Sequence, residues 1–248
     1  MVGNTEHGFK ELEALLLWLE PSRAGTWQGA SGAEIDQLEQ LAGQPLPGLY
    51  RWFLSRMGGT SSSLKGYPTF AFSASQIISC YANEEVAPDR RFFLIGWDCD
   101  DYLPQHLFYD FEHRTAVDAR VVLQPSVYGP QNSLYESLRM LVATTEFVLS
   151  RVLRFAQQCS GRFKMKGIGL RGPLDQIMSR LGYQKPVAAD LHAALFDRGD
   201  SAMSLKYNPG KSSNTNLFFQ FGGTDACVLR EVLDTLADEL QLEVEFDK

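Results

Sequence analysis

The sequence predicts an α+β protein, in which a mixed or antiparallel sheet flanked by helices is followed by a second, small α+β domain. Two capped helical segments occupy residues 31–57, and three strand-like runs follow one another between residues 92 and 123. Another set of strand and helix patterns fills residues 174–246. Successive strands separated by short polar turns favour antiparallel pairing, and the helices are expected to cover the resulting sheets.

Helical periodicity is clear near the N-terminus. Apolar residues recur there at three- and four-residue spacing, at Phe9, Leu12, Leu15, Leu16 and Leu19. This pattern predicts a helix over residues 5–19, which Pro21 ends. The segment lacks a basic start and a small-residue cleavage site, so we interpret it as an amphipathic helix and not as a signal peptide.

The next two helices are specified by their ends. Ser31 and Glu34 form a capping box, in which each side chain can bond the backbone of the other residue. Gly43 can adopt the left-handed conformation that closes a helix, and Pro45 prevents it from continuing. A further helix is predicted over residues 48–57, stopped by the glycine pair that follows.

The middle of the chain predicts an antiparallel meander covered by helices on at least one face. Ser73 or Ser75 can cap a brief helix after its first strand. The strand patterns cover residues 69–72, 92–96, 106–111 and 116–123. The helix expected next begins at Asn132 or Ser133 and restarts at Thr144 or Thr145.

Residues 151–171 are basic and interrupted by glycines, and their simplest interpretation is a solvated helix end and a linker. The alternative, which we favour, is that their charges pair with the acidic first half of the chain across the domain interface. We therefore place a boundary near Gly161, between a domain over residues 1–160 and a domain over residues 161–248. The second domain is expected to pack two helices on one face of an antiparallel sheet. Its predicted helices cover 174–181 and 227–240, and its strands cover 193–196, 202–207, 217–221 and 242–246.

The charge of the chain excludes some classes of partner. The formal net charge is −7, and residues 1–150 carry net −8 while residues 151–248 carry net +1. A general binder of nucleic acid or of membrane surfaces would show a basic footprint. No apolar run is long enough to span a bilayer, and four cysteines without metal-type spacing indicate a reducing compartment. We expect a cytoplasmic protein that binds neither nucleic acid nor a membrane.

No pattern in the sequence predicts catalysis. The four histidines do not cluster, and no GxSxG motif is present. The acidic neighbours of Cys99 would raise its pKa and weaken it as a nucleophile. We therefore expect a non-enzymatic protein with no cofactor and no metal. The enzyme alternative would place a site in the second half, using Asp197, Asp200, Lys206 and Lys211.

Two glycine-containing patterns match phosphate-binding motifs only in part. The glycines at 167, 169 and 172 give a literal GxGxxG, but basic residues precede them where a dinucleotide fold requires a buried strand. Gly210-Lys211-Ser212 resembles the end of a P-loop, although Leu205 stands where the first glycine is required. We interpret both as glycine turns.

The best candidate for a site is an acidic segment that follows a predicted strand. One interpretation is a solvated acidic loop; the other is a surface that docks a basic protein, with charge speeding the encounter and selecting the partner. The carboxylates of the preceding loop are expected nearby. The partner-binding residues predicted in this way are Glu84, Glu85, Asp89, Trp97, Asp98, Asp100, Asp101 and Tyr102.

Several of these motifs, taken in order, resemble the SUKH superfamily over roughly residues 5–150. The opening part includes Trp27-x-Gly29-Ala30-Ser31, Leu46-Pro47-x-Leu49-Tyr50 and Met57-Gly58-Gly59. The middle and closing parts are Leu94-Ile95-Gly96 with the acidic loop, Leu107-x-Tyr109-Asp110, and Ser133-Leu134-x-x-Ser137-Leu138. This is the family of Smi/Knr-type cell-wall-assembly regulators and many bacterial toxin-immunity proteins.

The resemblance implies a mixed α+β domain that binds proteins without catalysis. It favours an immunity protein that neutralises a cognate toxin, such as a nuclease with a basic cleft. A regulatory or scaffolding adaptor of the same fold, acting in cell-envelope or signalling assembly, is the alternative. The resemblance does not extend to residues 151–248, whose family stays unassigned.

Overall fold

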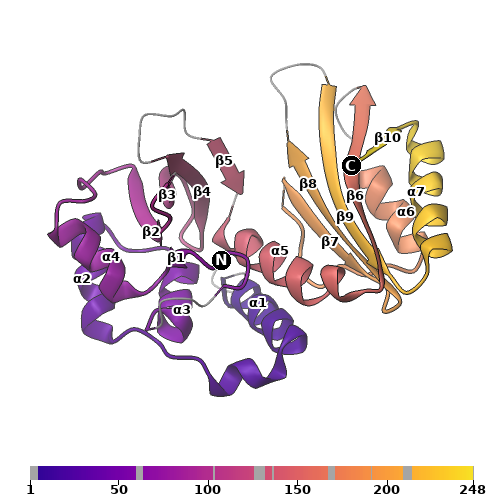
Figure 1. Cartoon of the computed structure of the whole chain (residues 1–248). Coiled ribbons are helices and arrows are strands. Elements are labelled where there is room, and N and C mark those ends of the chain that lie inside the picture. Colours follow the sequence, from indigo (N-terminus) through magenta and orange to yellow (C-terminus); the bar gives the residue numbers. More distant parts are fainter. Residues whose placement is uncertain are drawn as a thin grey trace. The chain divides into compact units, whose positions relative to one another are not determined.

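The computed structural model describes residues 5–59, 64–102, 104–125, 132–135, 137–166, 171–190, 192–208 and 214–247. It has the predicted α+β fold, with two antiparallel five-stranded sheets (Figure 1). The chain divides into two compact units, Met1–Val142 and Ala143–Lys248. The division therefore lies earlier than the boundary that we expected near Gly161.

The first unit begins with helices and ends with a meander. Its helices are α1 (Thr5–Leu19), the short 3₁₀ helix η1 (Pro21–Gly25), α2 (Gly32–Ala42), α3 (Gly48–Met57) and α4 (Ala74–Ala82). The sheet order is β1-β2-β3-β4-β5, so each strand pairs with its neighbour in sequence. The strands are β1 (Phe70–Ala71), β2 (Phe92–Asp98), β3 (Gln105–Arg114), β4 (Ala119–Pro125) and β5 (Asn132–Tyr135).

The predicted helix ends in this unit are confirmed. The Ser31 side chain accepts from the Glu34 N–H, and the Glu34 carboxylate accepts from the Ser31 N–H at 2.8 Å, which completes the capping box. Gly43 has a φ of +63° and ends α2 in the left-handed conformation. Ser73 caps α4 by accepting from the Gln76 N–H at 3.3 Å.

The core of the first unit centres on Tyr50 of α3. Its ring lies 6.3 Å from those of Phe53 and Phe93 and 5.4 Å from that of Tyr109, between centroids. All four side chains are almost fully buried. Burying one such side chain contributes about 1.5–3 kcal/mol, so this cluster fixes α3 against β2 and β3.

The prediction of a helix starting at Asn132 or Ser133 is wrong. Residues 132–135 form β5, which pairs with β4 through Ser133 and Tyr135. The helix α5 (Leu138–Ser150) begins later and runs through Thr144 and Thr145 without a restart. The physical reason lies outside the segment, because β4 offers residues 132–135 a free edge to pair with.

The second unit contains most of α5, the 3₁₀ helix η2 (Val152–Arg154) and a sheet in the order β10-β6-β9-β8-β7. Its strands are β6 (Gln157–Lys166), β7 (Ala193–Asp197), β8 (Ser201–Asn208), β9 (Asn214–Gly223) and β10 (Glu243–Phe246). The helices α6 (Arg171–Arg180) and α7 (Ala226–Leu240) lie on the same side of the sheet (Figure 1). This confirms the predicted arrangement of two helices on one sheet face.

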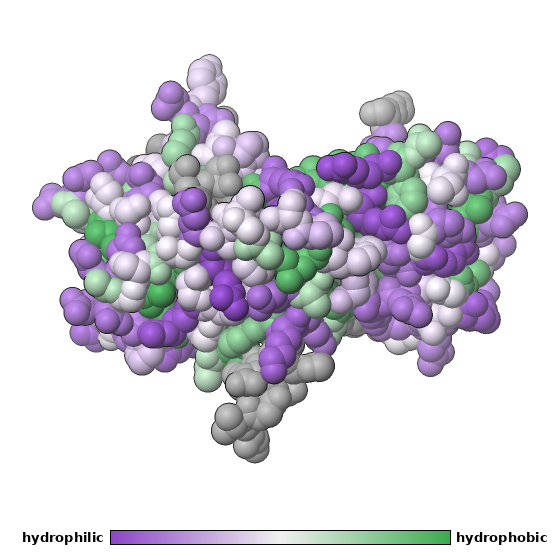
Figure 2. Space-filling view, turned by 90° about the horizontal axis from the view of Figure 1, so that it is seen from below, coloured by the Kyte–Doolittle hydropathy of each residue, from purple (hydrophilic) through white to green (hydrophobic). Residues whose placement is uncertain are grey.

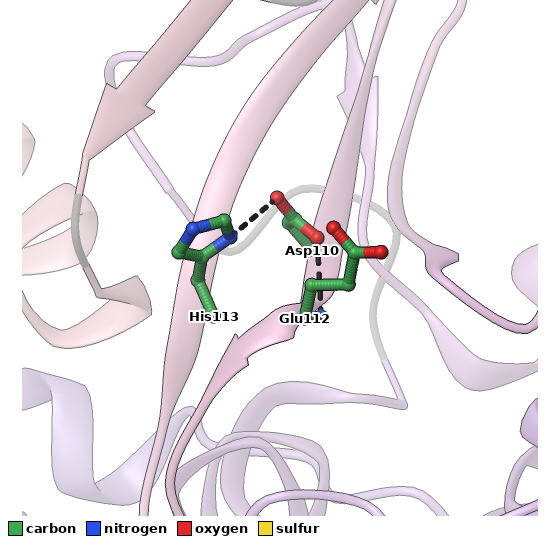
Figure 3. Close-up of side chains that lie close together, drawn as sticks. All are labelled: Asp110, Glu112 and His113. Atoms are coloured by element: carbon green, nitrogen blue, oxygen red, sulfur yellow. Dashed lines mark hydrogen bonds and ion pairs between the residues drawn. The ribbon is translucent and has the colours of Figure 1, made fainter.

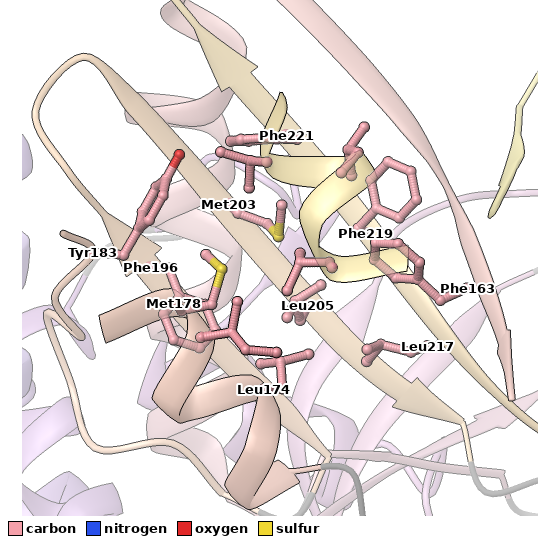
Figure 4. Close-up of a cluster of buried hydrophobic side chains, with 14 of the residues drawn as sticks. Phe163, Leu174, Met178, Tyr183, Phe196, Met203, Leu205, Leu217, Phe219 and Phe221 are labelled. Carbon is pink, nitrogen blue, oxygen red and sulfur yellow. The ribbon is translucent and has the colours of Figure 1, made fainter. Parts of the chain in front are cut away.

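Apolar residues of the two helices and of the sheet form one core in this unit (Figure 4). Phe163 of β6 and Phe219 of β9 lie at its centre, with ring centroids 4.8 Å apart. Leu174 and Met178 from α6 and Leu233 from α7 close it from the helix side. Each core strand contributes alternate residues to this core, because successive side chains of a strand point to opposite faces of the sheet.

The interpretation of residues 151–171 as a helix end and linker is wrong for most of the segment. Gly161 lies inside β6, paired with Phe219 on one side and with Phe246 on the other. The basic side chains of Arg162 and Lys164 both pair with Glu245 of β10. A strand carrying alternate charges therefore occupies an inner position in the sheet, where Glu245 of the neighbouring strand pairs with two of these charges.

On the face shown in Figure 2, hydrophobic residues form small separate patches among hydrophilic ones. Few large apolar side chains in the described part of the chain are strongly exposed. They are Trp18, Tyr102, Leu153, Phe218 and Phe246. Scattered residues of this kind are normal at a protein surface, so each needs a separate argument before it indicates a site.

Candidate functional site

The loop between β2 and β3 is organised by the carboxylate of Asp98, the last residue of β2. Asp98 is only 7% exposed, and its two oxygens accept the N–H of Asp100 at 3.2 Å and of Gln105 at 3.0 Å. Asp100 in turn accepts the N–H of Tyr102 at 2.7 Å. Because side-chain oxygens satisfy these backbone donors, the loop takes a defined shape. We call residues 98–102 the acidic loop.

The base of the acidic loop is fixed to the rest of the unit. The Cys99 N–H donates to the Thr69 carbonyl at 2.8 Å, and the Asp98 N–H donates to Nδ1 of His106 at 3.1 Å. The His106 ring stacks on Trp97, with centroids 3.8 Å apart and an interplanar angle of 10°. The acidic loop therefore begins beside an aromatic pair formed by the half-buried Trp97 and the buried His106.

The tip of the acidic loop faces solvent. Asp100 and Asp101 are exposed, and Tyr102 is 91% exposed. The structure thus brings five of the predicted residues together, from Trp97 to Tyr102. It gives them different roles, because Trp97 and Asp98 build the loop while Asp100, Asp101 and Tyr102 form its surface.

The three predicted residues of the preceding loop do not all join this surface. Asp89 lies before β2 and caps it, accepting the N–H of Arg91 at 2.6 Å and of Phe92 at 3.1 Å. The seven residues of β2 separate it from the acidic loop by roughly 20 Å, at about 3.3 Å per residue. The expected single acidic face is therefore divided along β2.

Glu84 and Glu85 are both exposed. Glu84 has a φ of +59°, and the Glu85 N–H returns to the Cys80 carbonyl at 2.9 Å, so the chain turns sharply after α4. The charge of Glu85 acts on His106, as does that of Asp98. Among the three predicted residues of the preceding loop, Glu85 is therefore the one whose charge acts on His106, next to the acidic loop.

The sequence offered little indication of the role of His106. Burial lowers the pKa of His106, and the carboxylates of Asp98 and Glu85 oppose this effect without reversing it. An Nδ1 that accepts an N–H carries no proton, so this geometry corresponds to the neutral ring with its hydrogen on Nε2. The one indication in the sequence is that His106 follows the acidic loop while Trp97 precedes it. A hairpin over these residues brings the two rings together.

Asp110, Glu112 and His113 at the far end of β3 place three potential metal ligands within 4.8 Å of one another (Figure 3). Arg91 already occupies this group, because its Nε and one terminal nitrogen donate to the two oxygens of Asp110 at 2.9 and 3.0 Å. Arg91 also pairs with Glu112 at 2.6 Å, and His113 Nδ1 lies 2.9 Å from Asp110. Burial alone would raise the pKa of Asp110, but the bonds from Arg91 and His113 outweigh it and hold the pKa below its usual value. The arrangement is an ion-pair network that leaves a cation little room.

The half-buried carboxylate of Asp118 holds the start of α5. Asp118 accepts the N–H of Leu138 at 3.2 Å and of Arg139 at 3.1 Å, and also the Tyr109 hydroxyl at 3.0 Å. These contacts cap the helix from a distant part of the chain. Burial raises the pKa of Asp118 to about 6, although the hydrogen bonds from the Arg139, Ala119 and Leu138 backbone and from Tyr109 favour the ionised form.

Two of the polar residues considered for an enzyme site in the second half, Asp197 and Asp200, are held by arginines at the β7–β8 hairpin. Arg151 donates to both oxygens of Asp197, at 2.6 and 3.2 Å, and Arg198 does the same for Asp200 at 2.8 and 3.0 Å. Ser201 contacts Asp200 and the Tyr183 hydroxyl but is fully buried. Lys211 and the glycines at 167 and 169 lie outside the described residues. The ion pairs with Arg151 and Arg198 therefore give Asp197 and Asp200 a structural role.

The cysteines of the described residues are free thiols. Burial raises the pKa of Cys80 to about 11, which keeps it protonated at neutral pH. Cys99 and Cys227 are exposed. Cys99 lies in the acidic loop.

Comparisons with protein-family models, curated proteins and solved structures gave no match to this chain. Within the parts of the chain that the structure describes, no helix combines the length and apolar character needed to cross a membrane. The class of this protein is therefore described by its fold and its acidic loop. It is a two-unit α+β protein with a preformed acidic hairpin loop.

Proposed function

We propose that this chain is a non-enzymatic, cytoplasmic immunity protein, which binds a cognate protein toxin and blocks it through the acidic loop. The observation that carries the proposal is the combination of a fixed loop backbone with an exposed tyrosine that follows two exposed carboxylates. Tyr102 is 91% exposed, and its N–H is held by Asp100. Tyrosine is enriched among the residues that dominate binding energies, and a fixed backbone loses little freedom on association.

Charge supports the same type of partner. The first unit carries 17 acidic and 10 basic residues, whereas the second carries 13 of each. A basic protein would therefore be attracted to the first unit, and such steering raises association rates. Toxins that act on nucleic acids have basic clefts, and the SUKH resemblance of residues 5–150 favours the same role.

The proposal is tested with the product of the adjacent reading frame. Co-expression of this chain should restore growth to cells that produce the neighbouring protein, and the two purified proteins should form a stable complex. A neighbouring protein that is harmless, or that is toxic but neither binds nor is suppressed, would remove the immunity role. Suppression without a complex would contradict neutralisation by direct binding.

A further inference from the structure

The sheet of the second unit has two edges, and within the described residues only the edge at β7 is covered by further backbone contacts. At β7, the N–H and carbonyl of Asp197 both bond to Gln184 at 2.9 Å, and the Ala193 carbonyl accepts the Asp190 N–H at 3.1 Å. These contacts blunt the edge at both ends, which is how proteins usually protect an edge strand. At the other edge, no described strand pairs with the outer side of β10 (Figure 1).

The register of β10 identifies which backbone groups face outward. The Asp247 N–H donates to the Ser160 carbonyl at 3.0 Å, and β10 pairs antiparallel with β6. Bonded positions alternate along an antiparallel pair, so Glu243, Glu245 and Asp247 direct their backbone groups toward β6. The N–H and carbonyl groups of Val244 and Phe246 therefore point away from the sheet and can receive another strand.

The side chains of β10 sort by the same alternation. Val244 and Phe246 lie on the helix side, where the Phe246 ring contacts Phe219 at 6.1 Å between centroids yet remains 57% exposed. Glu243, Glu245 and Asp247 lie on the opposite face. The edge therefore offers an apolar row and an acidic row on its two sides.

From these features we infer that β10 binds an extended segment of a partner protein in which basic and apolar residues alternate. The segment would pair antiparallel with β10, placing its apolar side chains beside Val244 and Phe246 and its basic ones beside Glu243 and Asp247. Arg162 and Lys164 already neutralise Glu245 from within the sheet. This is strand addition, in which backbone bonds give affinity and alternate side chains give specificity.

Charge disfavours a second copy of the same strand at this edge. An antiparallel β10 pair that keeps its apolar residues on one face places Val244 opposite Val244 and Glu243 opposite Glu245. Like charges directly opposite each other are destabilising in a sheet. The inference is independent of the acidic loop, which belongs to the other unit.

The test uses the full chain and a labelled peptide, acetyl-Lys-Val-Lys-Val-Lys-Val-Lys-amide, at about 0.15 M salt to limit unspecific attraction. Fluorescence anisotropy measures binding, with acetyl-Lys-Lys-Lys-Lys-Val-Val-Val-amide as a control of equal composition. Val244→Pro removes an outward donor at an edge position where proline is tolerated. It should weaken binding about tenfold, as expected for one lost backbone bond, whereas Val244→Ala keeps the donor and should bind nearly as well as the natural protein.

Hydrogen exchange gives the second readout. In the free protein the amide of Glu245 should be protected and those of Val244 and Phe246 should not, and the peptide should protect these two. The inference is overturned if the control peptide binds equally well or if Val244→Pro binds like the natural protein. It is also overturned by self-association through β10, or by binding that leaves the amides of Val244 and Phe246 unprotected.

Discussion

The backbone N–H of Asp98 donates to Nδ1 of His106 at 3.1 Å, at the point where β2 ends and the acidic loop begins. This bond exists only while Nδ1 is unprotonated, so the conformation of the loop is coupled to the charge of a buried histidine. Trp97 lies against the same ring. The relation gives the first unit a predictable response to pH.

Lowering the pH through the range below 6.5 should destabilise the first unit. The pKa of His106 is lowered on folding, so the unfolded chain binds a proton more readily and stability is lost as the pH falls. His106→Gln should make stability less dependent on pH in this range. Urea unfolding followed by tryptophan fluorescence measures this, because all four tryptophans belong to the first unit. The natural protein is the reference, and an unchanged slope in His106→Gln would contradict the coupling between His106 and the stability of this unit.

Asp118→Asn should lower the stability of the first unit by about 1–3 kcal/mol, because the amide nitrogen cannot accept from the donors that the carboxylate satisfies. The pKa of Asp118 is raised to about 6 on folding, so its favourable contribution is complete below about pH 4 and is lost as the pH rises through 6. The deficit of the variant should therefore shrink between pH 4 and pH 7. A deficit that grows over this range would show that the pKa is shifted the other way.

Gly29→Ala should destabilise the first unit by about 1–3 kcal/mol, the usual cost of forcing atoms into a packed site. A Cβ at Gly29 would lie 2.1 Å from the Ser55 carbonyl oxygen, where backbone cannot easily move. Gly25→Ala is the matched control, because nothing lies within 4 Å of the added atom. Equal melting temperatures for the two variants would contradict the packing of the 26–31 loop against α3.

Adding Zn²⁺ or Mn²⁺ should leave the melting temperature of the natural protein unchanged, because Arg91 holds both oxygens of Asp110. Arg91→Ala releases these ligands, and the same ions should then raise the melting temperature. Differential scanning fluorimetry with and without a chelator compares the two proteins. Stabilisation of the natural protein by low metal concentrations would make the group around Asp110 a metal site.

Local chemistry explains which parts of the fold could be predicted from the sequence. The capping box of Ser31 and Glu34 and the left-handed Gly43 depend only on residues within one helical turn. A short stretch of sequence is therefore enough to predict them. β6 depends on partners far along the chain, since Arg162 and Lys164 are neutralised by Glu245. Its alternation of Gly161 and Phe163 with charged residues was visible, but the charges and glycines suggested a linker.

The acidic loop was predicted only in part, again because some of its features depend on contacts with other parts of the chain. The sequence placed Asp100, Asp101 and Tyr102 in an exposed acidic loop, and all three are exposed there. It could not separate Asp98, whose buried carboxylate builds the loop, from its exposed neighbours. It also grouped Asp89 with them, although β2 holds the two apart. Those distinctions depend on strand length and on contacts with Gln105 and His106.

The most direct test of the account measures the affinity of this chain for the product of the adjacent reading frame by calorimetry. The variant Asp100→Lys, Asp101→Lys, Tyr102→Ala replaces the three exposed side chains of the acidic loop and removes the bond from the Tyr102 N–H to Asp100, while it keeps Asp98 and its bonds. Asp234→Lys, Asp238→Lys makes the same charge reversal on exposed positions of α7 and serves as the control. We predict at least a hundredfold loss for the loop variant, about 3 kcal/mol, and less than a threefold loss for the control. Equal affinities of the two variants would contradict docking through the acidic loop.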